Sequence, residues 1–383
     1  MYISRILPIF AIAISVLSCS SGNDSVIDPD PNPSLQAIAF GGKGGTWQDA
    51  QTSRATTTPL ENFFNSFRTW GYKTNDDYLT ATQVVMDRYI VQHNNDNGAD
   101  SWDYVGINNP TLSSATQTLK YWDYSATSYR FVAHSPADAN ITQQITSGIA
   151  SSQSLELTYP YEYSSEATST TVPYISELWL TEKEATGNEY GKCVTMTFVP
   201  IIAKVRIKFS YPEATKKIAI KNIHFSDTRF TTTPDAADTP LRGSLKASYP
   251  LTGKPSSAMP QLSWTPAIDN PSGSLILSVP YELKNDPIHI LSDTTQYEKW
   301  YYVPPLDIIP YEQGAYTMSA IIDGNYASTT VPAQFMQWKA GYQYTYIFKI
   351  TEAGTLISFA DMQMEQWLPG TDIDNRGSGT ESW

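Results

Sequence analysis

Four histidines, two cysteines and several acidic pairs are the residues from which catalysis or metal binding would have to be built. His93, His134, His224 and His289 are scattered, and none has a second histidine or a cysteine at the spacing of zinc ligands. The chain contains neither His-Glu-x-x-His nor Gly-x-Ser-x-Gly, the motifs of zinc proteases and serine hydrolases. We therefore expect a protein that is not an enzyme, with no metal and no cofactor.

Acidic pairs and a glycine-rich loop suggest glycoside hydrolysis and phosphate binding, but neither pattern is specific. Asp76 with Asp77, and Glu182 with Glu184, could act as glycosidase carboxylates, but a sequence does not give the carboxyl separation that this mechanism requires. A solvated surface is the simpler interpretation. The segment 41–46, GGKGGT, has the composition of a phosphate loop without its spacing, and no helical pattern follows it. We interpret it as a linker.

The composition is that of a secreted β-rich protein. Charged residues make up 16% of the 383 residues and aromatic residues 13%, with 25 Tyr and 25 Pro. The net charge of -13 argues against binding to a phosphate backbone, which needs clustered Lys and Arg. Nucleic acid is therefore not an expected partner.

Residues 1–18 are typical of a signal peptide, with Arg5 as a thin basic region and an apolar stretch over 6–17. The ending Val-Leu-Ser-Cys19 resembles a lipobox, which predicts lipidation (palmitate) at Cys19. An ordinary cleaved signal peptide with an incidental cysteine is the alternative. Residues 19–34 are polar and proline-rich, so we expect a tether with no apolar face to bury.

The stretch 35–55 joins a short apolar strand to an exposed arginine. Ile38 and Phe40 alternate with alanines, as a buried strand requires, and the glycines from 41 to 45 are expected to end that strand. The polar segment up to Arg54 is of the kind that proteases cut. We hypothesise that cleavage between Arg54 and Ala55 removes the strand and opens a groove for another chain.

Short alternating runs separated by polar turns predict packed antiparallel sheets. A four-residue spacing of isoleucines at 141, 145 and 149 predicts one short helix. Pro200 interrupts two alternating runs, so a domain boundary is placed between 198 and 199, and a tight turn at 352–354 predicts a C-terminal hairpin. The expected strands lie at 67–72, 82–91, 118–124, 129–134, 155–159, 194–198, 205–209, 217–225, 275–279, 300–303, 316–322, 343–351 and 355–365.

Several stretches together resemble the fimbrillin family of Bacteroidia, the lipoprotein precursors of type V pilus subunits. They span nearly the whole chain, and no single one is diagnostic. The resembling pieces are Cys19 in its lipobox, the strand Ile38-Ala39-Phe40 with Ser53-Arg54-Ala55, the runs 67–72 (FRTWGY), 120–122 (KYW), 129–136 (YRFVAHSP), 198–209 and 302–306 (YVPPL), and the ending 338–346 (WKAGYQYTY) with Gln366-Trp367.

The resemblance implies an all-β fold of two transthyretin-like antiparallel β-sandwich domains in tandem, at 35–198 and 199–368, followed by a tail at 369–383. It also implies that an arginine-specific protease cuts at Arg54-Ala55 at the outer membrane, removing the strand with Ile38 and Phe40. A C-terminal strand of a neighbouring subunit then fills the groove. Carried over to this sequence, the donor side chains are Leu356, Ile357, Phe359, Met362 and Met364.

Other functions remain open from the sequence. A subunit that keeps its first strand would stay lipid-anchored and act as an anchor of the pilus. Ten tryptophans and the run 300–302 also allow a glycan-binding adhesin, although aromatic residues favour strands and cores in any case. The expected partners are thus other pilus subunits, the protease, the outer membrane, and host or bacterial surface glycans or proteins.

Overall fold

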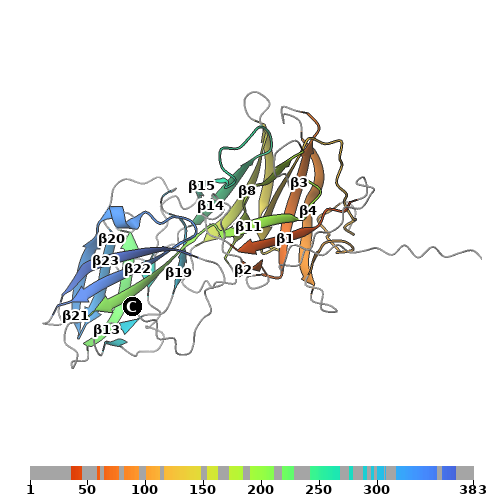
Figure 1. Ribbon diagram of the computed structural model, residues 1–383. Coiled ribbons are helices and arrows are strands. Elements are labelled where there is room, and N and C mark those ends of the chain that lie inside the picture. The colour runs from red at the N-terminus through yellow and green to blue at the C-terminus, as the bar shows by residue number, and fades with distance from the viewer. Residues whose placement is uncertain are drawn as a thin grey trace, which may run out of the picture.

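A computed structural model describes most of the chain. The described residues are 36–44, 58–60, 64–76, 82–94, 101–112, 116–147, 153–162, 172–183, 190–210, 218–227, 242–267, 276–278, 288–290, 295–296, 300–305, 307, 316–351 and 356–367. Their elements are almost entirely β-strands, as expected for the fold class. Figure 1 shows these strands gathered in two lobes.

The first lobe is built on a sheet that closes into a ring. Its strands follow one another in the order β6-β3-β4-β5-β1-β11-β9, and β9 also pairs with β6, which completes the circuit. The short strands β2 and β10 pair with β1 and β6. The bounds are β1 (Phe40–Gly44), β2 (Thr58–Pro59), β3 (Ser66–Thr74), β4 (Gln83–Asn94), β5 (Ser101–Asp103), β6 (Ser128–Ser135), β9 (Tyr174–Ser176), β10 (Trp179–Glu182) and β11 (Val194–Pro200).

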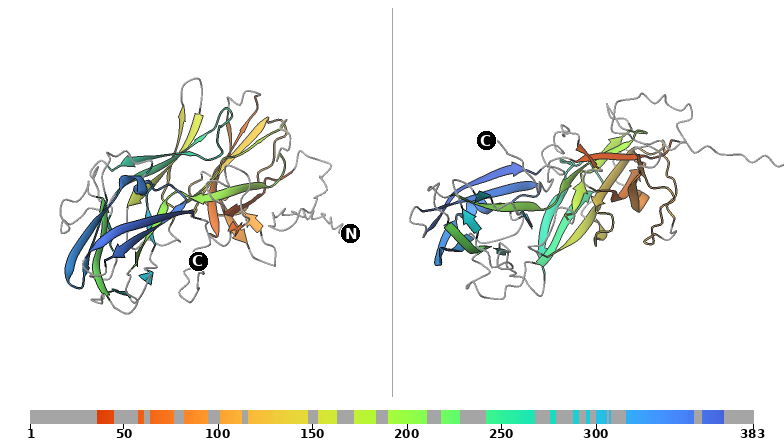
Figure 2. Two further views of the ribbon diagram at one scale, coloured as in Figure 1. Left: turned by 60° about the vertical axis from the view of Figure 1, so that its left-hand side comes forward. Right: turned by 90° about the horizontal axis from the view of Figure 1, so that it is seen from below.

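A second sheet, in the order β15-β14-β8-β7, lies against the outside of this ring. The hydroxyl of Tyr249 donates to the carbonyl oxygen of Ser176 over 2.9 Å, and the rings of His134 and Tyr159 meet edge to face at 6.1 Å. Both views of Figure 2 show its turquoise strands beside the yellow ones. The bounds are β7 (Thr142–Ser147), β8 (Gln153–Glu162), β14 (Arg242–Pro250) and β15 (Gln261–Pro266).

The other lobe packs two further sheets. One has the order β18-β12-β22-β23 with β19 on β12, and the other has the order β16-β13-β20-β21 with β17 on β13. The bounds are β12 (Ala203–Ser210), β13 (Ile218–Asp227), β16 (Ile276–Ser278), β17 (Ile288–Ile290), β18 (Thr295–Gln296), β19 (Tyr301–Val303), β20 (Tyr316–Ile322), β21 (Asn325–Val331), β22 (Tyr342–Ile350) and β23 (Ile357–Gln366). A 3₁₀ turn, η8 (Ala333–Met336), precedes β22.

Most of the expected strands are confirmed, including the C-terminal hairpin, in which β22 and β23 pair antiparallel. The break at Pro200 is also confirmed, because β11 ends there and β12 begins at Ala203 in a different sheet. Pairing is not antiparallel throughout. β1 lies parallel to β11, and β12 lies parallel to β22.

Three local predictions were wrong. Residues 142–147 form β7 and not a helix, because a spacing of four residues places side chains on one face of a strand as well as of a helix. The segment 118–124 forms no strand, and only Tyr121 makes an isolated bridge, with Ala37. The glycines at 41, 42 and 44 do not end the first strand; they belong to β1.

The sheets do not divide at the boundary that was expected between 198 and 199. β14 pairs with β8 over nine residue pairs, from Arg242 opposite Glu162 to Pro250 opposite Ser154. The β15-β14-β8-β7 sheet therefore joins strands from both sides of that boundary. A pairing between segments so far apart in the chain leaves no local signal in the sequence.

Candidate functional site

β1 is the element on which the predicted function depends, and it lies inside the closed ring. It pairs parallel with β11, from Phe40 opposite Val194 to Gly44 opposite Phe198. On its other side Phe40 pairs with Trp102 of β5, while residues 43 and 44 pair antiparallel with β2. Figure 1 shows β1 beside β11, with β2 close to its end. Removing β1 would therefore open the ring between β5 and β11.

The two apolar side chains of this segment are fully buried in the ring. Ile38 is 1% exposed and Phe40 0%. The ring of Phe40 meets those of Phe67, Tyr104 and Phe131 edge to face, at centroid distances of 6.1, 5.7 and 5.6 Å. Such edge-to-face contacts add about 0.5–1.5 kcal/mol each to the burial term. Phe40 therefore occupies the centre of an aromatic core; its alternation with alanine predicted its burial but not these aromatic neighbours.

The backbone before β1 is also held on both sides. The amide of Ile38 donates to the carbonyl oxygen of Lys120 over 2.8 Å, and the amide of Trp122 donates to that of Gln36 over 2.9 Å. The amide of Val194 donates to the carbonyl oxygen of Ala39 over 2.9 Å. The hydroxyl of Tyr104 donates to the carbonyl oxygen of Ile38 over 3.0 Å. Burial raises the pKa of Tyr104, so this hydroxyl keeps its proton at all physiological pH values.

The lack of space around Gly42 explains why β1 contains a glycine at this position. A Cβ atom at this position would come within 2.5 Å of Cδ1 of Leu60 and 2.8 Å of the carbonyl oxygen of Met196. Leu60 is 0% exposed and follows β2 directly. A residue other than glycine would have to displace either a buried side chain or the backbone of β11. This contact could not be predicted from the local sequence, because Leu60 comes from another segment.

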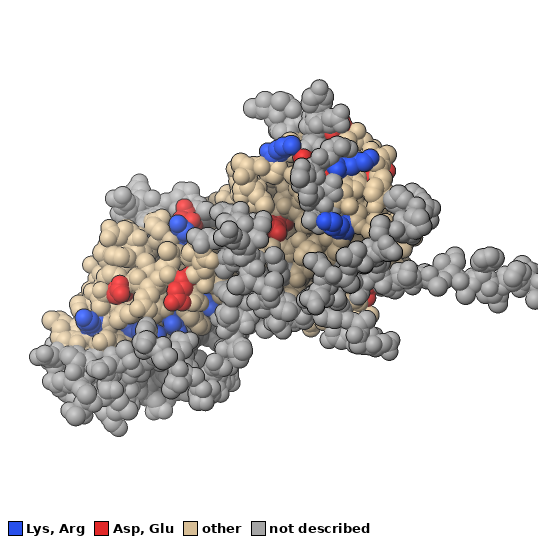
Figure 3. Space-filling view, in the orientation of Figure 1, with Lys and Arg blue, Asp and Glu red and all other residues tan. Residues whose placement is uncertain are grey.

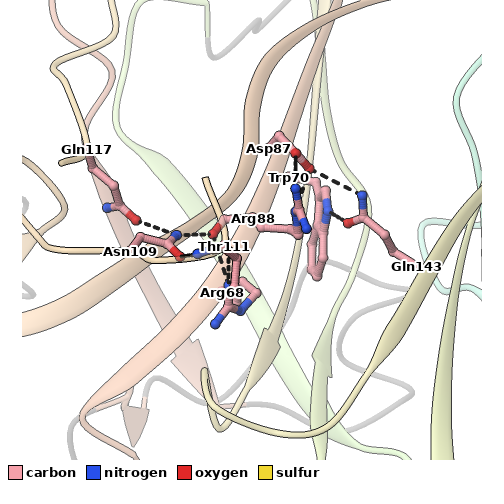
Figure 4. A network of polar contacts seen from close by, with 8 residues as sticks. All are labelled: Arg68, Trp70, Asp87, Arg88, Asn109, Thr111, Gln117 and Gln143. Carbon is pink, nitrogen blue, oxygen red and sulfur yellow. Dashed lines mark hydrogen bonds and ion pairs between the residues drawn. The ribbon is translucent and has the colours of Figure 1, made fainter. Parts of the chain in front are cut away.

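A network of side-chain hydrogen bonds holds residues 104–112 and 116–122 in place beside the backbone that precedes β1 (Figure 4). The side-chain amide of Gln117 accepts from the amide of Ile90 at 2.7 Å and donates to its carbonyl oxygen at 2.8 Å, as a neighbouring strand would. The same amide nitrogen donates to the carbonyl oxygen of Tyr104 at 2.8 Å. Asn109 donates to the carbonyl oxygen of Arg88, beside a β-bulge in β4. The network thereby positions Tyr104 against Ile38.

Arg68, on β3, contacts the same part of the chain through Thr111. Its Nε donates to the carbonyl oxygen of Ala137 over 2.8 Å, and its Nη1 reaches the hydroxyl of Thr111 at 3.3 Å. Burial lowers the pKa of Arg68, with the neighbouring charge of Arg88 as the second cause. Figure 4 also shows Trp70 donating to the side chain of Gln143, which donates in turn to Asp87. Sequence reasoning assigned no role to these polar residues.

The predicted lipidation and processing residues, Cys19, Arg54 and Ala55, lie outside the described residues. The described chain resumes at Thr58, where β2 pairs with the end of β1. Residues 45–57, which include the Arg54-Ala55 bond, therefore connect two paired strands. Cleavage of that bond would leave β1 in the ring through non-covalent contacts alone.

The predicted donor residues lie on β23 and directly before it, at the edge of the sheet. Among the described strands, β23 pairs with β22 alone. Ile357 is buried and Phe359 and Met362 are half-buried, whereas Leu356 is 60% and Met364 50% exposed. The five residues thus do not share one buried face. Beyond the strand, the amide of Trp367 donates to the carbonyl oxygen of Gly341 over 2.8 Å, and its indole lies 4.8 Å from Nζ of Lys204.

Asp77 and Glu184 lie outside the described residues, and the described residues considered for other chemistry are not assembled into a site. Among the described residues there is no group of three His, Cys, Asp or Glu that could hold a metal ion. His134 is fully buried between aromatic rings, and burial lowers its pKa to about 3, assisted by the charge of Arg68. Trp300 is half-buried, while the other described tryptophans are nearly or fully buried: 70, 102, 122, 179, 264, 338 and 367. They pack in cores and are not free to stack on sugars.

A family model described as fimbrillin-like matches residues 53–367, which is most of the chain. The chain belongs to the fimbrillin-like family. The resemblance inferred from the sequence is thereby confirmed. A search of curated proteins found no match. The family model begins after β1 and ends at Trp367, the residue that follows β23.

Solved structures of low sequence identity also resemble this fimbrillin-like chain. A candidate cell adhesion protein from Bacteroides uniformis is 13% identical, with a TM-score of 0.43 over 88% of this chain and 100% of its own. Another from Bacteroides ovatus is 12% identical, with a TM-score of 0.39 over 87% of this chain and 98% of its own. In the part of the chain that the structure describes, no helix is long and apolar enough to cross a membrane.

Proposed function

We propose that this fimbrillin-like chain is a structural and adhesive subunit of a cell-surface type V pilus, assembled by removal of β1 and donation of a strand from a neighbouring subunit. It acts without catalysis. The lipid on Cys19 holds the precursor at the outer membrane, and an arginine-specific protease releases it by cutting between Arg54 and Ala55. The subunit then joins other pilus subunits and contacts host or bacterial surfaces.

The observation that carries this proposal is the position of β1 in the ring. β1 is one strand of a closed circuit, and it meets its antiparallel partner β2 through the connection that contains Arg54. A single cut there detaches β1 and leaves every other described strand covalently intact. The vacated position would expose the unpaired edges of β5 and β11 and an apolar trough, both of which a strand from another chain can cover.

Burial of apolar side chains can hold subunits together through such a strand. On the described part of the face drawn in Figure 3, charged side chains of both signs lie in small separate groups. Burying a set of four or five apolar side chains would yield roughly 6–15 kcal/mol before ordering costs. A subunit interface of that kind can be long-lived without complementary charged patches.

The experiment compares the wild-type protein with Arg54→Ala, both recovered from the cell surface of a Bacteroidia host. The N-terminal sequence, the intact mass and the migration on unheated denaturing gels are measured. We expect wild-type protein that begins at Ala55 and forms a detergent-resistant ladder, and a variant that retains lipidated Cys19 and forms no ladder. A wild-type protein that keeps Cys19 and stays monomeric would overturn the proposal and leave a lipid-anchored subunit.

A further inference from the structure

Trp367, the residue that follows β23, lies where the two lobes meet. The centroid of its ring lies 5.7 Å from that of Tyr302, on β19 of the second lobe, and 6.5 Å from that of Tyr174, on β9 of the first lobe. Figure 1 shows β19 on the side of the second lobe that faces the first. Trp367 is 0% exposed. One side chain at the end of the last strand therefore contacts both lobes.

The shortest connection between the lobes has two residues. Ile201 and Ile202 alone separate β11, in the first lobe, from β12, in the second. The chain crosses between the lobes twice more, from β13 to β14 over 228–241 and from β15 to β16 over 267–275. Short connections of this kind absorb the backbone changes when two lobes turn relative to each other. Residues 201–202 are thus the expected pivot.

Backbone hydrogen bonds through Gly341 connect Trp367 to this pivot. The amide of Gly341 donates to the carbonyl oxygen of Ile202 over 2.9 Å, and its carbonyl oxygen accepts from the amide of Trp367 over 2.8 Å. Gly341 has a φ of 74°, a left-handed conformation that glycine adopts without strain. Trp367 is therefore fixed to the second lobe beside the pivot, and its contact with Tyr174 opposes rotation of the first lobe.

We propose that the packing of Trp367 between Tyr302 and Tyr174 holds the two lobes in one orientation, and that the lobes turn about residues 201–202 when the indole leaves this contact. A hydrogen bond from the hydroxyl of Tyr161 to the carbonyl oxygen of Tyr302 also crosses between the lobes, but at 3.3 Å it is long. The aromatic contact is therefore the one on which the orientation depends.

The contact also depends on β23 staying in its sheet. Trp367 directly follows Gln366, the last residue of β23, so the whole strand cannot leave β22 without drawing the indole out. Nε1 of Trp367 is buried without a hydrogen-bond partner in the described part of the chain, so it gains one on reaching water. A subunit that donates its C-terminal strand would thus gain a flexible joint. That consequence rests on the proposed function, whereas the contact itself does not.

The test measures the distance between spin labels on the two lobes by double electron–electron resonance. It uses the uncleaved chain from Ser20 onward, in which Cys193→Ala removes the one remaining cysteine. The labels are attached through Val84→Cys on β4 and Tyr326→Cys on β21, where the native residues are 59% and 63% exposed. We expect one narrow distance distribution, as two lobes in a single orientation require.

The deciding variant is Trp367→Ala, for which we expect a distribution about twice as wide. Trp122→Ala is the matched control. Trp122 is 2% exposed and its Nε1 also lacks a partner among the described residues, but its ring packs on Tyr129 and Tyr190 of the first lobe. This control loses the same side chain from a core and should keep the narrow distribution.

Two shortened chains give a second comparison. A chain that ends at Gln366 keeps β23 without Trp367, and a chain that ends at Gly370 keeps both. We expect a wide distribution in the first and a narrow one in the second. If Trp367→Ala does not fold, Tyr174→Leu removes the first-lobe side of the contact and should widen the distribution instead.

Two results would overturn the proposal. Folded Trp367→Ala with an unchanged distribution would show that other contacts set the orientation. Equal widening in Trp122→Ala would show that lost stability, and not the contact between the lobes, is the cause. Because every measurement uses uncleaved monomers, its result does not depend on processing or on ladder formation, and the proposed function can fail separately.

Discussion

β1 and β23 are strands of the same chain with opposite surroundings. β1 lies within a closed ring, with strands on both sides and Phe40 among three aromatic rings. β23 lies at the edge of an open sheet, with one partner and much of its surface exposed. The difference indicates that losing β1 opens a buried aromatic core between two strands, whereas freeing β23 breaks its nine residue pairs with β22 and uncovers one edge of a sheet.

The largest expected effect comes from removing an aromatic side chain from β1. We expect Phe40→Ala to lower the free energy of unfolding by about 3–5 kcal/mol, because the cavity lies in a closed aromatic core. Phe359→Ala in β23 should cost less than about half of that, since its ring is half-buried at an edge. Urea unfolding of the intact, uncleaved chain measures both. Equal losses would contradict the contrast between the two strands.

A smaller effect should follow from adding a side chain where β1 has no room. We expect Gly42→Val to destabilise the intact chain by about 3 kcal/mol, the upper end for overpacking, because Leu60 and the backbone of β11 both resist movement. Ala360→Val, at the exposed edge of β23, is the matched control and should stay within about 0.5 kcal/mol of wild type. Thermal unfolding of the wild-type protein and the two variants tests this. A Gly42→Val variant as stable as wild type would show that the Leu60 side chain can move aside.

The two regions also differ in how much the sequence revealed. The alternation of Ile38 and Phe40 with alanines was enough to predict their burial, although β1 itself begins only at Phe40. The β22-β23 hairpin was predictable because its partners are adjacent in the chain. The glycines of β1 were misassigned because their place in the strand depends on Leu60 and Met196. The pairing of β14 with β8 and the bracing of Tyr104 by Gln117 likewise depend on contacts between distant segments. Periodicity identified the strands, but it could not identify their neighbours.

Acid should destabilise the first lobe, which contains the closed ring, through protonation of His134 on β6. Burial lowers the pKa of this histidine to about 3, while the unfolded chain keeps a value near 6.5. The unfolded state therefore binds the additional proton as the pH falls below about 6.5, and the native state loses stability until about pH 3. From pH 7.5 to pH 5 we expect this one group to cost about 2 kcal/mol.

The two lobes should differ in how strongly acid destabilises them. Hydrogen exchange at pH 5 should rise in β3 and β6 more than in β22 and β23. Substituting His134→Phe should flatten the pH dependence of unfolding between 7.5 and 5. His93→Phe, at a half-buried histidine on β4, is the control and should leave the His134 contribution in place. If the free energy of unfolding of the His134→Phe variant depends on pH as steeply as that of wild type, another group is responsible for the acid effect.

The smallest expected effect concerns the two donor residues that point to solvent. Leu356 and Met364 are 60% and 50% exposed, so their replacement by serine removes little buried surface. We expect the double substitution to change the free energy of unfolding by less than about 0.5 kcal/mol per site. Because Ile357 and Phe359 are the donor side chains that face inward in β23, ladder formation should also persist. Loss of the ladder with unchanged stability would mean that the donor strand uses its other face, since a slip of one residue exchanges the two faces of a strand.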